Sequence, residues 1–137
     1  MSELSHATQV TAAILLLGLV TVETGGLYLL RVVRGRADTT PFQLAFARAG
    51  HAHAGVLLIL SLLALLYADA ARLSGPLEVI GRSGIPAAAL LMPGGFFFAS
   101  IGKARTRPNG FIVMVFVGGA CLAAGLIALA VGMLQSA

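Results

Sequence analysis

Two histidines one residue apart, His51 and His53, are the side chains best suited to chemistry in this sequence. They stand in the stretch ARAGHAHAG, where almost every neighbour is alanine or glycine. If the stretch is helical, side chains two positions apart point in directions about 200° apart, so one straight helix cannot direct both imidazoles at the same ion. Imidazole nitrogen is a good axial ligand for haem iron and also binds copper or zinc. We expect two ligand positions on opposite flanks, or one site shared between helices; the alternative is two histidines that only hydrogen-bond backbone or water.

Glu23 is a second candidate because it is a carboxylate inside a long apolar segment, in the stretch TVETGG. Ionisable groups in such segments usually have a function. Glu23 could act as a proton relay, as a metal ligand, or as a hydrogen-bond acceptor that orients a histidine. The alternative is a structural carboxyl bonded to the neighbouring threonines. Antiparallel helices would place Glu23 at a depth similar to that of His51.

Basic residues surround the histidine segment in the sequence. Arg48 precedes His51 by about one helical turn, where it could pair with Glu23, an acidic cofactor group or a lipid phosphate. A second group follows the third apolar segment and consists of Lys103, Arg105 and Arg107. These residues could also bind an acidic cofactor group or a lipid phosphate, although basic residues at such positions more commonly set the membrane topology.

Four apolar segments must position these residues. Hydrophobic residues make up 58% of the 137-residue chain and charged residues 10%, whereas soluble domains carry about 25% charged residues. A bilayer core is crossed by roughly 20 apolar residues. We predict an all-α, integral membrane bundle forming a single domain, with a kink in the third helix near Pro93. The four predicted transmembrane helices cover about 8–33, 42–68, 77–102 and 110–134.

The charge and cysteine content exclude several classes of protein. The formal charge is +4, but the basic residues stand at segment ends, so nucleic-acid binding is not indicated. Cys121 is the only cysteine, which excludes an intrachain disulfide and a cysteine-based metal site. The first apolar segment is too long for the core of a signal peptide, so we expect it to be retained. Basic loops after the first and third segments predict both termini outside the cytoplasm of a prokaryotic-type inner membrane.

The stretch Arg48 to Leu60, RAGHAHAGVLLIL, resembles the haem-bearing helices of the catalytic subunits of haem–copper oxidases and nitric oxide reductases. Those subunits are built from three arcs of four helices, and the second helix of each arc carries metal ligands. In the last arc a His-x-His pair binds a different haem on each side of its helix. In the reductases an arginine stands three residues before a haem histidine, as Arg48 stands before His51.

The resemblance implies a single arc that binds haem b through His51 and His53 and closes a ring as a homotrimer. It also implies that the basic loop Lys103, Arg105 and Arg107 holds haem propionates. We expect electron transfer, redox or gas sensing, or a simple oxidoreductase step, with a redox partner and substrate that the sequence does not identify. One alternative is a small proton or metal-ion conductor that uses Glu23 and the two histidines. Another is an accessory structural subunit of a larger membrane complex.

Overall fold

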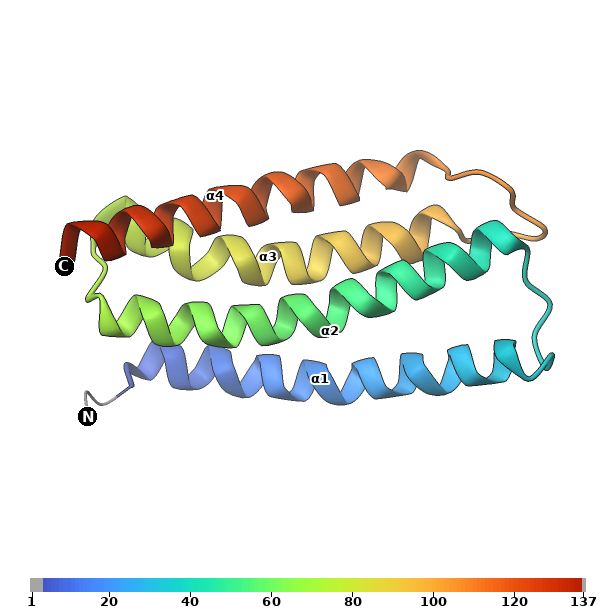
Figure 1. The fold of residues 1–137 in the computed structure, drawn as a ribbon, viewed down its shortest axis with the longest axis horizontal. Helices are drawn as coiled ribbons and strands as arrows, with labels where there is room; N and C mark the ends of the chain where they lie inside the picture. The colour runs from blue at the N-terminus through green and yellow to red at the C-terminus, as the bar shows by residue number, and fades with distance from the viewer. Residues whose placement is uncertain (1–3, 137) are drawn as a thin grey trace.

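The described residues, 4–136, form four long helices in this computed structural model (Figure 1). They are α1 (His6–Val33), α2 (Pro41–Ala70), α3 (Gly75–Ala99) and α4 (Val113–Ser136), and a short 3-10 helix, η1 (Gly110–Ile112), leads into α4. No strand occurs in this range, so the all-α prediction is confirmed. α3 ends at Ala99, three residues before the predicted end. It runs as one continuous helix through Pro86 and Pro93.

Side-chain caps explain where α1 and α2 begin. The Ser5 hydroxyl accepts a hydrogen bond from the Thr8 amide (3.2 Å). Thr40 and Gln43 form a reciprocal capping box at the start of α2, with Pro41 at the first helical position. The side-chain amide of Gln43 also donates to the carbonyl oxygens of Ser100 (3.1 Å) and Gly102 (2.8 Å). The start of the histidine-bearing helix is therefore tied to the loop after α3.

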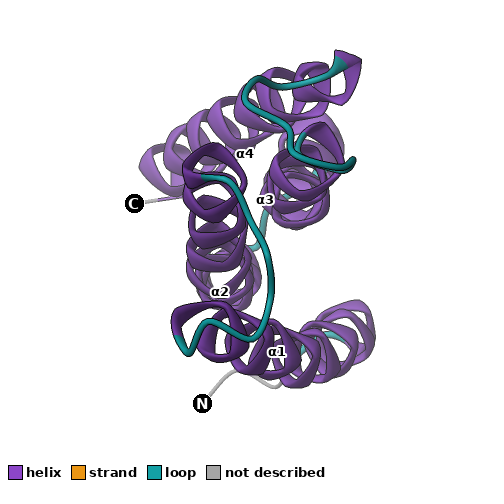
Figure 2. Ribbon diagram, turned by 90° about the vertical axis from the view of Figure 1, so that its right-hand side faces the viewer, coloured by secondary structure: helices purple, strands orange, loops and turns teal. Residues whose placement is uncertain are grey.

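The helices form a curved row in chain order. Viewed along the bundle, α1 and α4 lie at the two ends of the row, with α2 and α3 between them (Figure 2). α3 packs on both α2 and α4, whereas the backbone of α1, within the described residues, lies close to α2 alone and reaches α3 through side chains. One flank of α2 is therefore covered by α1 and another by α3, which is the condition for two sites on one helix.

Glycines bring α3 and α4 into close contact. A Cβ atom on Gly84 would lie 2.7 Å from the Cys121 carbonyl oxygen and 2.8 Å from the Gly125 Cα, and one on Gly95 would lie 2.7 Å from the Val115 nitrogen. No side chain fits at those distances, so the two backbones touch directly. Close approach over small residues is typical of helix pairs in membranes.

Three of the described helices are long and apolar enough to cross a membrane: α1, α2 and the segment Gly110–Ser136, with mean hydropathies of 1.9, 1.9 and 2.6. α3 does not meet the same measure, so the prediction of four spans is met for three. The reason is its composition, since α3 contains Glu78, Arg82, two prolines and several glycines. These residues lower its mean hydropathy even though it is an interior member of the row.

Candidate functional site: the histidine segment of α2

His51 lies against the backbone of α1. A Cβ atom on Gly25 would be 3.2 Å from the His51 Nδ1, and one on Gly26 would be 3.5 Å from its Cε1 and 3.7 Å from its Nε2. The two glycines thus leave room for the imidazole between the helices, where it is half-buried. Among residues 4–136, the one hydrogen bond of a histidine ring belongs to His53 and not to His51. The His51 ring is held by packing, and its nitrogens are free.

His53 lies on the side of α2 that faces α3. Its Nδ1 is 2.8 Å from the Ala49 carbonyl oxygen, one turn back on the same helix. A carbonyl only accepts hydrogen bonds, so Nδ1 carries a proton, and the neutral form of this ring has its lone pair on Nε2. A metal-bound histidine is commonly oriented by such a bond from its other nitrogen. The prediction that the two imidazoles point to opposite flanks of the helix is therefore correct.

Phenylalanines of α3 position His53. The ring centroids of His53 and Phe96 are 5.0 Å apart. A Cβ atom on Gly50 would lie 3.0 Å from Phe97 and 3.2 Å from the Phe96 Cβ. Because Gly50 has no side chain, α3 comes close enough for Phe96 to cover the His53 ring. The small residues around the histidines therefore serve the packing of α2 on both of its neighbours.

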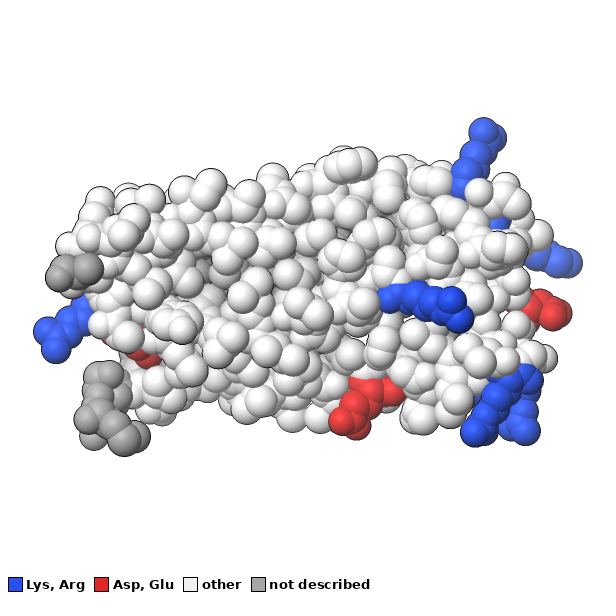
Figure 3. Space-filling model, viewed as in Figure 1, with Lys and Arg blue, Asp and Glu red and all other residues white. Residues whose placement is uncertain are grey.

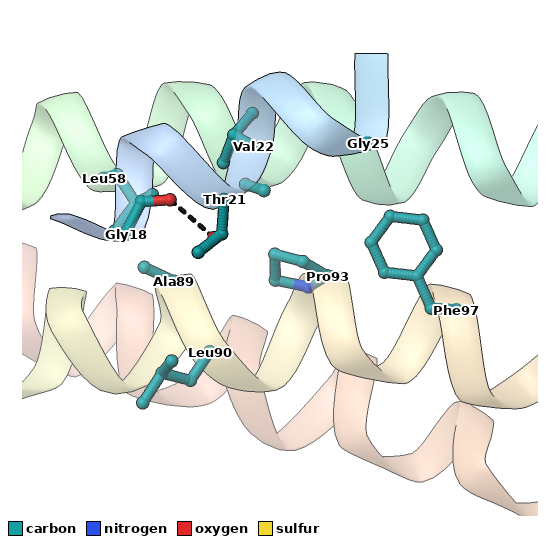
Figure 4. A pocket seen from close by; sticks show the side chains of 10 residues that line it. Gly18, Thr21, Val22, Gly25, Leu58, Ala89, Leu90, Pro93 and Phe97 are labelled. Carbon is teal, nitrogen blue, oxygen red and sulfur yellow. Dashed lines mark hydrogen bonds between the residues drawn. The ribbon is translucent and has the colours of Figure 1, made fainter. Parts of the chain in front are cut away.

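A groove of about 260 Å³ runs between α1 and α3 with α2 as its floor (Figure 4). The floor residues Ala54 and Leu58 follow His51 by three and seven positions, which places them on the same helix face. Gly25 lines the groove and also lies beside the His51 ring. His51 therefore lies next to one end of the groove, beside Gly25, and does not itself line it. The lining is apolar or small and consists of Gly18, Thr21, Val22, Gly25, Ala54, Leu58, Ala89, Leu90, Pro93 and Phe97.

Glu23 and Arg48 are both exposed. No hydrogen bond joins Glu23 to a histidine or a threonine of the described chain, and the hydroxyls of Thr21 and Thr24 instead donate to the carbonyls of Gly18 and Thr21 (both 2.6 Å). The structure does not bring Glu23 to the imidazoles as a hydrogen-bonded partner. The alternative, a structural carboxyl bonded to threonine, is not found among the described hydrogen bonds either.

The basic loop lies at the end of the bundle rather than at the histidines. Lys103 and Arg107 are exposed, and the Arg105 Nε donates to the Ile101 carbonyl (2.9 Å). His51 is ten residues into α2, which is roughly 15 Å along the helix axis. The loop therefore contributes positive charge above the site and does not contact it.

A polar network at the opposite end of the bundle was not predicted. Arg82 of α3 forms an ion pair with Asp69 of α2 and donates to the Thr8 hydroxyl of α1 (2.8 Å) and to Glu78 (3.2 Å). The amide and hydroxyl of Ser5 both donate to Asp69 (3.0 Å each). We call these residues the Asp69–Arg82 network. Glu78 and Arg82, four residues apart where the third apolar segment begins, were the available signal.

No three histidine, cysteine, aspartate or glutamate side chains come together as a metal-binding group among residues 4–136. A site with three protein ligands is therefore not assembled within the described part of one chain. Axial ligation of haem iron needs only one or two imidazoles, and the arrangement of His51 and His53 offers that. No protein-family model, curated protein or solved structure matches this chain.

Proposed function

We propose that this chain is an integral membrane protein that binds haem b through His51 and His53 and serves in electron transfer or in redox or gas sensing. The supporting observation is that two imidazoles in an apolar helix keep nitrogens free of protein partners, on flanks that face two different helices. Ionisable side chains within membrane-spanning segments are functional candidates by default. The ring nitrogens that make no hydrogen bond to the protein are therefore the atoms that would bind a ligand.

The surface supports the proposal of membrane integration. Large apolar side chains are widely exposed, for example Leu17 (69%) and Leu134 (79%). Basic side chains project mainly from the ends of the molecule (Figure 3). With three helices suited to span, α3 becomes the fourth span because α2 and α4 cover it. We propose a multi-pass protein of a prokaryotic-type inner membrane.

The donors around α2 fit haem iron. His53 holds its Nδ1 proton on the Ala49 carbonyl, so Nε2 is directed away as a ligand. His51 packs on Gly25 and Gly26, next to the groove that Gly25 lines. The groove is slightly smaller than the roughly 300–1,000 Å³ of ligand pockets, so a porphyrin would also occupy its open side. Bound haem would supply one-electron chemistry, while the apolar lining would exclude water and the basic loop would balance carboxylates.

Copper or zinc is the alternative occupant of the same residues. Because the described part of one chain brings no three metal ligands together, such an ion would need imidazoles from more than one copy. A homo-oligomer is also part of the proposal for haem. The family resemblance implies a ring of three, which would bring the α1 edge of one copy to the α4 edge of the next.

An absorption spectrum with metal analysis, after expression with added haem, tests the proposal. We expect a Soret band in the unaltered protein, a weaker or shifted band in His51→Ala and in His53→Ala, and none in the double variant. His6→Ala, at the start of α1, is the matched control and should retain the band. A colourless, metal-free preparation of the unaltered protein would refute haem and metal binding alike.

A further inference from the structure

We infer that a second copy of this chain packs on the outer face shared by α1 and α2, with Glu23 of each copy paired with Arg48 of the other. The inference does not depend on haem. It concerns a surface that the proposed ligand sites do not use.

Glu23 and Arg48 lie on the same side of the molecule, away from the groove. Glu23 is about 160° around α1 from Gly25, and Arg48 about 120° around α2 from Ala54, where Gly25 and Ala54 line the groove. Glu23 is the only acidic residue of α1 and Arg48 the only lysine or arginine of α2. Figure 3 shows an acidic side chain over α1 and a basic one over α2 on one face, apart from the charged ends.

The two charges also lie at similar depths along the bundle. Gly25 and His51 are in contact, which aligns the two helices at that level. Glu23 is then about 3 Å to one side of this level and Arg48 about 4.5 Å to the other. A separation of roughly 7–8 Å along the axis is one that a long arginine side chain and a glutamate can bridge.

Both charges need a partner. Each is exposed in a helix suited to span a membrane, and an isolated charge in hydrocarbon is costly. The described ion pairs use other residues, since Arg82 takes both Asp69 and Glu78. The surrounding surface of α1 is apolar and uncovered, with Val20 58% and Leu27 64% exposed.

A second copy satisfies both charges at once. Rotation about an axis normal to the membrane keeps every residue at its own depth. A face that carries one acid and one base at similar depths is therefore complementary to itself. A two-fold pair would place Glu23 opposite Arg48 at two equivalent contacts, as expected for an isologous interface. A ring of three joins two different edges of each copy. Glu23 and Arg48 lie on one face, so a two-fold pair fits them better than the contact of a ring.

Co-expression of two charge-reversed chains tests the inference. One chain carries Glu23→Arg and the other Arg48→Glu, with different affinity tags. Each variant alone places like charges opposite each other, whereas the mixed pair restores opposite charges at both contacts. We expect differently tagged unaltered copies to co-purify, each variant alone to lose at least tenfold in association, and the mixed pair to regain it. Crosslinking should give the mass of two chains.

The test separates contact between copies from pairing within a chain. Pairing within one chain would be restored only when both reversals are in the same molecule, and that result would overturn the inference. Absence of association in the unaltered protein, or unchanged association in each variant, would overturn it too. Arg36→Glu, in the exposed loop after α1, is the matched control and should associate normally. If a reversal prevents membrane insertion, Glu23→Gln and Arg48→Gln should each still weaken association.

Discussion

Polar side chains make very different contacts at two places in this bundle. In the Asp69–Arg82 network, three helices contribute donors and acceptors, and Arg82 alone contacts a carboxylate on each of two helices and a hydroxyl on a third. In the histidine segment, His51 contacts glycine backbone and His53 has one bond to its own helix. The difference separates a polar cluster that joins helices from two imidazoles that make no hydrogen bond to another helix.

The comparison predicts where stability resides. Arg82→Ala should have the largest effect, because it leaves Asp69 without its ion pair while both side chains are mostly buried (17% and 9% exposed). Removing one partner of such a pair costs roughly 3 kcal/mol. Unfolding in detergent should show this loss. Arg72→Ala, at an exposed position, is the control, and equal stability of the two variants would contradict a structural role for the network.

A bulky residue opposite His51 tests the other region. Gly25→Leu should displace the imidazole, since a Cβ atom there already lies 3.2 Å from Nδ1. We expect a stability cost of about 1–3 kcal/mol from overpacking together with a weakened Soret band. Gly119→Leu is matched, because nothing lies within 4 Å of a Cβ atom there. An unchanged spectrum in Gly25→Leu would separate His51 from the ligand site.

The cap that begins α2 should matter less. Thr40→Ala removes a hydroxyl that accepts a hydrogen bond from the backbone N–H of Gln43 and donates one to the Arg105 carbonyl. Loss of such a cap costs about 1 kcal/mol, measured as the free energy of unfolding. The Soret band should persist, because Thr40 is eleven residues before His51. Loss of the band with only a small change in stability would show that the loop reaches the site.

The smallest effect should come from Glu78, the exposed member of the Asp69–Arg82 network. Its side chain is 43% exposed, and it pairs with Arg82 four residues away on the same helix. Exposed pairs of this kind contribute about 0.3–0.5 kcal/mol. Glu78→Gln should therefore be nearly as stable as the unaltered protein. A loss as large as that of Arg82→Ala would mean that the network acts as one unit.

Local patterns predicted the helices and the directions of the histidines, because run length, caps and helical periodicity act over a few residues. The ion pair of Asp69 with Arg82, and the bonds from Ser5, could not be predicted in this way. They depend on which helices become neighbours, and the residues stand far apart in the sequence. The same holds for α1, whose backbone lies close to α2 alone within the described residues and whose Glu23 is exposed. The depth of Glu23 along the bundle was predictable from the sequence, but the side of the bundle that it faces was not.

Haem titration of the purified protein, followed at the Soret band, tests the ligand role of the histidine segment most directly. The unaltered chain and Arg72→Ala should bind haem saturably with the same stoichiometry. The chain carrying both His51→Ala and His53→Ala should remain folded and bind none. Equal binding by that double variant, or no binding by the unaltered chain, would contradict the account.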